Sequence, residues 1–305
     1  MEVKRENPAW LDKSHPNYFR WEKSRKLSAD RGKFVYSIVS QSLVCKGLTI
    51  LDLGSGEGGT VKVFSQDNFV VSFDISLIRL QRQREIVIPK DPDLIRESEE
   101  SVVKIQGNFS PSNSFEMNGL NLVNGTALQL PFSDQAFDLI IIQDVIEHLS
   151  DTGLFYTEIK RIIKSNGSIY LSTPNKLSVF NFISDPHFGL PVISMLKRNS
   201  IKKYFLKYFR KSDYNRKDIA QLLSLIDLLN LFMNDFSINI NTKYSVKELF
   251  KGNKGIVWSD FHLKLISFCK IISLDIFVNA IANDHPGYIN KYFTPTFYLI
   301  LKRKN

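Results

Sequence analysis

One stretch of the sequence decides the fold: Leu51-Asp52-Leu53-Gly54-Ser55-Gly56-Glu57-Gly58-Gly59. The apolar run 48–53 leads into the glycines and has the pattern of a strand buried on both faces of a sheet. Glycines at alternate positions remove side chains and permit positive φ angles where the chain leaves this strand. A strand, a glycine loop and a following helix predict a site at which a nucleotide lies against exposed backbone.

Short β-rich runs recur along the rest of the chain and alternate with helical patterns or crossovers. This alternation predicts right-handed βαβ units and a parallel sheet. We expect an α/β fold, a Rossmann-like, doubly wound, mostly parallel seven-stranded sheet with an inserted lid and a helical C-terminal extension. Polar, proline-containing residues 89–118 are expected as a surface insertion. The expected strands are residues 48–53, 69–73, 120–123, 137–142, 168–172, 236–240 and 297–301.

Changes in composition predict four regions in the 305 residues. Polar and aromatic residues 1–30 are expected to form an N-terminal cap, and residues 31–175 the nucleotide-binding core. Residues 176–216 are expected to form a lid or acceptor insertion. Residues 217–305 would supply C-terminal helices and the last strands, including a very apolar, largely buried helix over 217–233.

Two carboxylates indicate which nucleotide the loop would take. Asp52 lies two residues before the first glycine, where its charge would repel a pyrophosphate but attract the cationic amino group of a methionine moiety. Asp74 ends the next buried run, where a carboxylate can accept both hydrogen bonds from a ribose diol. Each carboxylate alone could instead be a turn or cap residue. Together with the glycines, they favour a cationic, single-nucleoside cofactor over a dinucleotide.

Three ordered motifs resemble those of class I S-adenosylmethionine-dependent methyltransferases, and the type 11 group in particular. The motifs are Ile50-Leu51-Asp52-Leu53-Gly54-Ser55-Gly56-Glu57-Gly58, Asp74-Ile75-Ser76 and Leu130-Pro131-Phe132-Ser133-Asp134-Gln135-Ala136-Phe137-Asp138. The resemblance covers approximately residues 31–175. It implies S-adenosylmethionine as the cofactor and methyl transfer as the reaction.

The resemblance also implies where the cofactor would lie. The first motif would hold its methionine part, and Asp74 would hold its ribose. The pair that places the adenine is here Thr126-Ala127, where the family commonly has Asp at the position of Thr126. Gln143 would lie beside the cofactor and face the acceptor. The full expected cofactor-binding set is Asp52, Gly54, Ser55, Gly56, Asp74, Ile75, Thr126, Ala127 and Gln143.

Candidate catalytic groups follow the fourth expected strand. A sulfonium already makes its methyl group electrophilic, so a base is needed only where the acceptor must lose a proton. Asp144, Glu147 and His148 are spaced to share one face of a helix at the mouth of the site. They could be a structural element, His148 could be a general base, or the three could form a divalent metal site. The metal alternative resembles the acidic-x-x-Glu-His motif of some small-RNA 2′-O-methyltransferases and quinone O-methyltransferases, but no second histidine follows at a matching place. No metal ligand is therefore assigned.

A second candidate base lies in Asp185-Pro186-His187-Phe188-Gly189-Leu190-Pro191. Two prolines place His187 rigidly, in a region that usually covers the acceptor in this fold, although a turn with a solvent-facing histidine is the alternative. The candidate catalytic residues are therefore His148 and His187. Because either could deprotonate a hydroxyl, oxygen is the preferred methylated atom.

The chain is basic, with a formal net charge of +9. Seven of its lysines and arginines fall within residues 197–211, interleaved with aromatic residues. A solvated lid helix is one interpretation, and contact with an anionic membrane surface or a lipid-linked acceptor is the other. No apolar run of 18 residues and no disulfide framework is present, so we expect a cytoplasmic protein, peripheral at the membrane if that contact forms.

The expected acceptor is a small molecule or a lipid-linked or sugar-linked precursor. An RNA methyltransferase is an alternative that the positive charge and the partial metal motif favour, although no aromatic base-stacking module is recognisable and nucleic acid is the less favoured partner. A nicotinamide dehydrogenase is another, against which Asp52 counts. A binding module that keeps the fold and has lost the reaction is the third.

Overall fold

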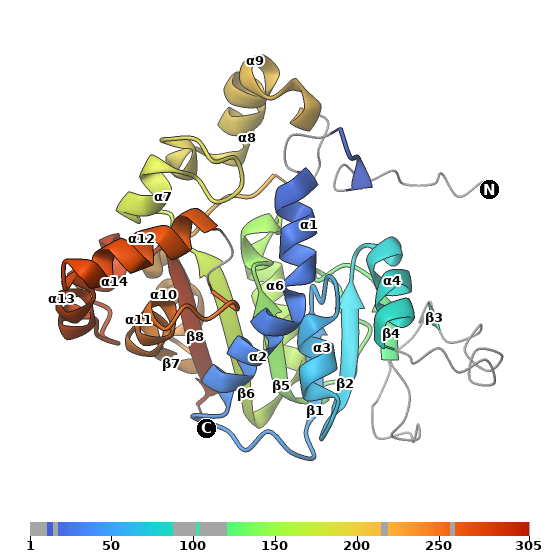
Figure 1. Ribbon diagram of the computed structural model, residues 1–305. Helices are drawn as coiled ribbons and strands as arrows, with labels where there is room; N and C mark the ends of the chain where they lie inside the picture. The colour runs from blue at the N-terminus through green and yellow to red at the C-terminus, as the bar shows by residue number, and fades with distance from the viewer. Residues whose placement is uncertain are drawn as a thin grey trace.

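The computed structural model describes residues 11–14, 18–87, 102–103, 121–214, 219–256 and 260–304. In Figure 1 a central sheet stands between layers of helices, with further helices above it. The surface insertion expected over residues 89–118 lies outside the described residues, except for one two-residue strand.

In the described part of the chain, eight strands form one sheet in the order β3-β4-β2-β1-β5-β6-β8-β7. Neighbours from β3 to β6 are parallel, whereas β8 is antiparallel to both β6 and β7. All seven expected strands are present, and the eighth is the short edge strand β3. The strands are β1 (Thr49–Leu53), β2 (Phe69–Asp74), β3 (Val102–Val103), β4 (Asn121–Asn124), β5 (Phe137–Gln143), β6 (Ile163–Pro174), β7 (Phe236–Ile240) and β8 (Thr296–Arg303).

The parallel strands are buried on both faces, as their continuous apolar sequences require. In β1, Ile50 packs into the core on one face and Leu51 into the core on the other, and Leu139 and Ile140 of β5 alternate in the same way. The sheet is therefore doubly wound. Helices α2 (Ser28–Val39) and α3 (Gly59–Phe64) pack on the Ile50 side, and α6 (Thr152–Ile162) and α10 (Leu225–Phe232) on the Leu51 side.

Close contact between α2 and α3 fixes the start of α3, which follows directly on the glycine loop. A Cβ atom on Gly32 would lie 2.3 Å from the carbonyl oxygen of Gly59. The two backbones can therefore approach only because residue 32 has no side chain.

Residues 176–214 lie above the carboxyl ends of the parallel strands in Figure 1. Their short helices have a small core of their own, made of Phe188, Ile193, Ile201, Phe205 and Leu206 together with Ile219. The helix expected within 197–211 is present and runs without a break through a π-helical turn. The helices are α7 (Val179–Ile183), η3 (Ile193–Met195), α8 (Arg198–Ser200), the π-helical η4 (Ile201–Leu206), α9 (Lys207–Phe209) and η5 (Lys211–Asp213).

The remaining helices lie at the two ends of the chain and between the strands. Among the described residues, no helix combines the length and the apolar character needed to cross a membrane. These helices are α1 (Tyr18–Lys26), α4 (Leu77–Val87), η2 (Ile146–His148), α11 (Thr242–Phe250), α12 (Asp260–Ile271), α13 (Leu274–Ile281) and α14 (Tyr288–Tyr292).

The apolar helix expected over residues 217–233 is shorter than predicted, because α10 begins only at Leu225. Ser224 and Asp227 form a capping box: the Ser224 hydroxyl oxygen accepts from the Asp227 amide at 3.2 Å, and an Asp227 carboxylate oxygen accepts from the Ser224 amide at 2.8 Å. Just before this cap, Leu223 forms an isolated β-bridge with Asn175. The apolar residues ahead of the cap are therefore buried in irregular chain.

Candidate functional site

The glycine loop leaves the carboxyl end of β1 with three residues in the left-handed region. Gly54, Gly56 and Gly58 have φ angles of 77°, 55° and 73°. The Gly54 amide donates to the carbonyl oxygen of Phe73 at 2.7 Å, which ties the loop to β2. A Cβ atom on Gly54 would lie 2.2 Å from a methyl group of Val145, so this position requires glycine for space as well as for conformation.

Asp52 is a buried carboxylate directly below this loop. Its side chain is 2% exposed, and among the described residues its Oδ2 atom has no hydrogen-bond partner. Burial, helped by the nearby charge of Asp74, raises its pKa to about 8. A buried carboxyl with an unused acceptor atom is suited to receive a cation.

Asp74 ends β2, the strand next to β1, and holds the other side of the loop. Its Oδ2 accepts from the Gly56 amide at 2.9 Å, and its Oδ1 accepts from the Ser76 amide at 2.8 Å. The hydrogen bond from Gly56 places the two sequence motifs side by side. Each carboxylate oxygen keeps a lone pair for a ligand.

Gln83 is a residue of this site that the sequence did not reveal. It is fully buried in α4, and its side-chain amide donates to the Ser55 hydroxyl at 2.9 Å and to the Gly56 carbonyl at 2.7 Å. Ser72 hydroxyl oxygen lies 2.7 Å from both the Ser55 hydroxyl and the Gln83 amide oxygen. This network holds the glycine loop against α4. In the sequence, Gln83 is one of several polar residues in a helix rich in Arg and Gln, and nothing sets it apart.

The other expected cofactor-binding residues lie around the same edge of the sheet. Ile75 is 77% exposed, and its carbonyl accepts from the side-chain amide of Asn124 at 3.0 Å. Thr126 is exposed after β4, with its hydroxyl oxygen 3.3 Å from the Leu128 amide, and Ala127 packs against the core. Gln143 is the last residue of β5 and is half-buried.

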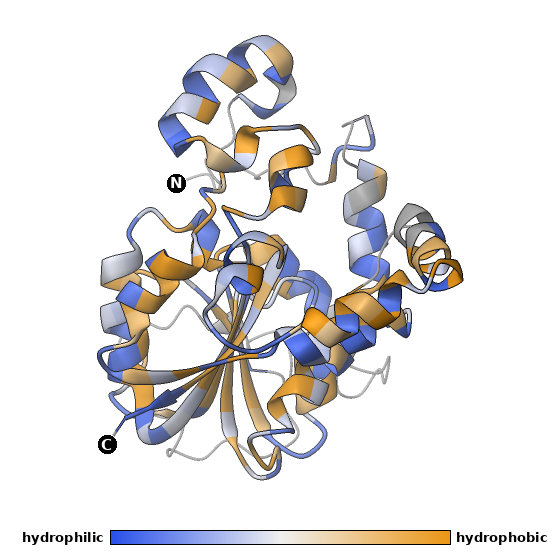
Figure 2. Ribbon diagram, turned by 90° about the vertical axis from the view of Figure 1, so that its left-hand side faces the viewer, coloured by the Kyte–Doolittle hydropathy of each residue, from blue (hydrophilic) through white to orange (hydrophobic). Residues whose placement is uncertain are grey.

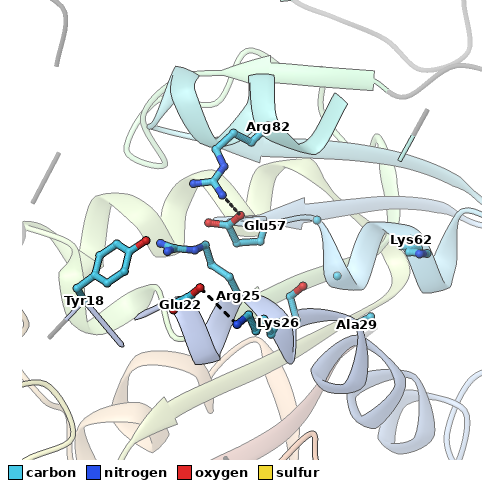
Figure 3. Close-up of a pocket in the computed structure, with 11 residues that line it drawn as sticks. Tyr18, Glu22, Arg25, Lys26, Ala29, Glu57, Lys62 and Arg82 are labelled. Carbon is cyan, nitrogen blue, oxygen red and sulfur yellow. Dashed lines mark ion pairs between the residues drawn. The ribbon is translucent and has the colours of Figure 1, made fainter. Parts of the chain in front are cut away.

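A pocket of about 480 Å³ adjoins the outer side of the glycine loop. Figure 3 shows charged side chains from α1, the loop, α3 and α4 around it, including Glu57 4.0 Å from Arg82. Glu57 and Gly58 of the loop line this hollow, but none of the residues expected to bind the cofactor does. The pocket therefore lies beside the expected cofactor-binding residues and does not include them.

The two candidate catalytic histidines, 39 residues apart in the chain, lie together. The ring centroids of His148 and His187 are 5.1 Å apart at an angle of 80°. Glu147 joins them, with its Oε1 atom 4.0 Å from His187 Nε2. Asp144 is not part of this group. Residues 146–148 form a 3₁₀ turn in place of the expected α-helix, and Asp144 Oδ1 lies 3.1 Å from the Ser172 hydroxyl.

Glu147 is held deep in the protein. Its side chain is 1% exposed, its Oε2 accepts from the Thr173 hydroxyl at 3.0 Å, and its Oε1 has no hydrogen-bond partner among the described residues. Burial and, second, the charge of Asp144 raise its pKa to about 8.

Residues of the 176–214 segment hold this cluster in place. Asp185 is buried, and its Oδ1 accepts from the amides of His187 and Phe188 at 2.8 and 2.9 Å, which sets the turn that carries His187. Arg198 donates to the carbonyl oxygens of Glu147 and Leu149 at 3.1 and 2.9 Å. The helix above the sheet is thus tied directly to the turn that carries Glu147 and His148.

Residues 51–171, which contain the glycine loop, Asp52, Asp74 and the Glu147–His148 turn, match a family model described as a methyltransferase domain. Residues 51–171 therefore form a methyltransferase domain, and the chain has the fold of the class I methyltransferases. A crystal structure of an S-adenosylmethionine-dependent methyltransferase from Mesorhizobium loti agrees with the fold, with a TM-score of 0.50 and 13% identity over 88% of this chain and 96% of that one.

Curated relatives match this chain over its core. A glycine/sarcosine/dimethylglycine N-methyltransferase of Actinopolyspora halophila is 28% identical over 41% of this chain and 18% of its own length. A demethylmenaquinone methyltransferase of Staphylococcus aureus is 23% identical over 45% of this chain and 60% of its own. The chain therefore spans less than two thirds of the length of either relative.

Proposed function

We propose that this methyltransferase transfers the methyl group of S-adenosylmethionine to an oxygen atom of a small-molecule, lipid-linked or sugar-linked acceptor. The observation that carries the proposal is the glycine loop between Asp52 and Asp74. The buried Asp52 Oδ2, which accepts no hydrogen bond from any described residue, suits the cationic amino group of S-adenosylmethionine. A dinucleotide would bring its pyrophosphate up to the Asp74 carboxylate, which disfavours it.

The remaining cofactor contacts follow from the strand ends. Asp74 would accept from the ribose hydroxyls with the lone pairs that the loop amides leave unused. Thr126 and Ala127 would lie along the adenine, and Gln143 between the cofactor and the acceptor. The hydroxyl of Thr126 offers a weaker, uncharged acceptor than the aspartate common in the family.

The reaction we propose is a single in-line displacement. The acceptor oxygen attacks the methyl carbon, the carbon–sulfur bond breaks, and S-adenosylhomocysteine leaves as a neutral thioether. The hydroxyl proton passes to a base, and His148 and His187, whose rings lie 5.1 Å apart, are the candidate bases. Residues 176–214 would act as the lid over the acceptor. The relatives named above act on a quinone and on glycine and its methylated forms, which supports a small acceptor; the preference for oxygen rests on the histidines.

Calorimetry tests the cofactor assignment. We expect S-adenosylmethionine and S-adenosylhomocysteine to bind and NAD to give no heat. Replacing Asp74 with alanine should weaken S-adenosylmethionine binding by about 1.5–3 kcal/mol, because a hydrogen-bond acceptor that is charged is lost from the ribose and from the loop. Asp67→Ala is the matched control, since Asp67 is exposed before the start of β2. Tight NAD binding, or unchanged affinity in Asp74→Ala, would contradict the assignment.

We also propose that the acceptor is reached at an anionic membrane surface. The α8–η4–α9 helix exposes Tyr204, Tyr208 and Phe209, which are 58, 65 and 74% exposed, between the lysines of residues 197–211. Figure 2 shows hydrophilic and hydrophobic segments alternating on this uppermost helix. Aromatic side chains beside lysines suit the interface of an anionic bilayer. Ile271, the last residue of α12, is another exposed apolar side chain, at 80%.

Vesicle sedimentation tests the membrane contact. At low salt, the protein should sediment with phosphatidylcholine vesicles that contain phosphatidylglycerol and stay in solution with phosphatidylcholine alone, since each lysine near such a surface contributes about 1 kcal/mol. The triple variant Lys202→Glu, Lys203→Glu, Lys207→Glu should lose this binding. Lys46→Glu should keep vesicle binding, because Lys46 is an exposed residue just before β1, at the amino ends of the parallel strands. Equal binding to both vesicle types would exclude the proposal.

A further inference from the structure

Glu147, His148 and His187 each offer one ligand atom, and these atoms all lie within 4.8 Å of one another. No other three histidine, cysteine, aspartate or glutamate side chains in the described part of the chain come together in this way. The sequence alone could not show that these three residues lie together, because His187 is in a turn that follows α7 in the chain.

The environment of Glu147 favours a cation at this point. Thr173 binds its Oε2 atom, and Arg198 and the Gln221 amide, at 3.1 and 2.8 Å, bind its main-chain carbonyl. The side chain is therefore fixed, yet Oε1 accepts no hydrogen bond within the described structure. The contact of this atom with His187 Nε2, at 4.0 Å, is too long for a hydrogen bond. An unsatisfied buried carboxylate oxygen is costly.

We propose that Glu147, His148 and His187 bind one divalent transition-metal ion. Nitrogen and oxygen ligands lie about 2.0–2.2 Å from such an ion, which places two ligand atoms of a tetrahedral site about 3.3–3.6 Å apart. Separations of up to 4.8 Å need to close by at most about 1.5 Å, which rotations of the two imidazole rings can provide. Two histidines and one carboxylate are a donor set of zinc and non-haem iron sites, and they leave coordination positions open.

The place of the site suggests its use. Val145, two residues before Glu147, packs against Gly54 of the glycine loop, so the cluster borders the cofactor site. An acceptor hydroxyl bound at an open coordination position of the ion would lose its proton to water more readily. The imidazoles would then act by holding the ion. This use rests on the proposed methyl transfer, whereas metal binding itself does not.

Equilibrium dialysis against Co²⁺ and Zn²⁺, with elemental analysis, tests the proposal on chelator-treated full-length protein without a histidine tag. We expect one ion per chain, visible absorption bands for bound Co²⁺, and at least 100-fold weaker binding in Glu147→Gln and in His187→Asn. His187→Asn changes only a loop side chain, so it gives a result even if Glu147→Gln fails to fold. His285→Asn, at an exposed histidine elsewhere, is the control and should bind normally.

Two outcomes would overturn the metal site: no binding of either ion at millimolar concentration, or binding that neither variant changes. S-adenosylmethionine calorimetry on the same samples separates this from the proposed function. If the protein binds Co²⁺ through these residues but binds no S-adenosylmethionine, the metal site stands and the cofactor assignment is refuted. If it binds S-adenosylmethionine but no Co²⁺, the cofactor assignment stands and the metal site is refuted.

Discussion

Replacing Asp52 with asparagine is expected to weaken S-adenosylmethionine binding about 100-fold, or ~2.7 kcal/mol, and to abolish a proton release that accompanies binding. Burial raises the pKa of Asp52 to about 8, so near pH 7 the free protein holds this carboxyl mostly protonated. A bound ammonium group favours the ionised form and lowers that pKa. Binding near neutral pH should therefore release close to one proton per chain.

The pH dependence of cofactor binding follows from the same carboxyl. Affinity should rise, by up to about tenfold per pH unit, as pH approaches 8, because progressively less free energy is needed to ionise Asp52. The rise should end near pH 8, where an α-amino group such as that of the cofactor begins to lose its own proton. Asp52→Asn should bind weakly without this rise, because an amide does not ionise.

Titration calorimetry near pH 7 in phosphate and in Tris measures the proton release, since the two buffers differ in ionisation enthalpy. The control is Asp67→Asn, which should match the native chain. If Asp52→Asn released the same proton and kept its affinity, the cationic group would bind elsewhere.

The free energy of unfolding of Asp52→Asn distinguishes the loss of a cofactor contact from damage to the fold. Because the pKa of Asp52 is raised in the folded state, the folded protein holds a proton that the unfolded chain has lost, between about pH 4 and pH 8. The free energy of unfolding therefore falls as pH rises through this window. Asp52→Asn removes this fall, so near pH 8 and without cofactor the variant should be the more stable protein. A variant that lost both binding and stability would not support the role proposed for Asp52.

The cofactor edge could be predicted from sequence because its parts are local. The glycines follow β1 directly, and Asp74 ends the next strand. Carboxyl ends of adjacent parallel strands meet at one edge of a sheet, so the Gly56–Asp74 hydrogen bond follows once the strands are recognised. Gln83 could not be found in this way, since a buried glutamine and an exposed one look alike in a helix.

The acceptor side could not be assembled from sequence. His148 and His187 are separated by α6, β6, α7 and irregular chain, which have no period that fixes where His187 points. The spacing of Asp144, Glu147 and His148 indicated a helical face, but the chain after β5 makes a single 3₁₀ turn. The extra length of the predicted 217–233 helix has a related cause, because apolar content alone does not show the capping box at Ser224.

His148 and His187 should prove to be one functional unit. Replacing either with alanine is expected to lower turnover by about 10²–10⁴-fold, the usual worth of a positioned proton-accepting group, with little change in S-adenosylmethionine affinity. The double variant should be no slower than the slower single variant, because side chains that act together are strongly non-additive. Rings 5.1 Å apart beside a buried Glu147 are the structural reason to expect this.

The measurement is S-adenosylhomocysteine formation in a screen of phenols, quinols, lipid-linked and sugar hydroxyls, with amines and RNA as comparison classes. His285→Ala, at an exposed site, should keep full turnover. Product from hydroxyl compounds that falls in both single variants supports oxygen methylation at this cluster, since Asp52 and Asp74 remain intact in those variants and the cofactor still binds. Turnover on amines or RNA that is indifferent to both histidines would instead show that the acceptor lies elsewhere. Cofactor binding without product from any class would favour a binding module that keeps only the first half of the site.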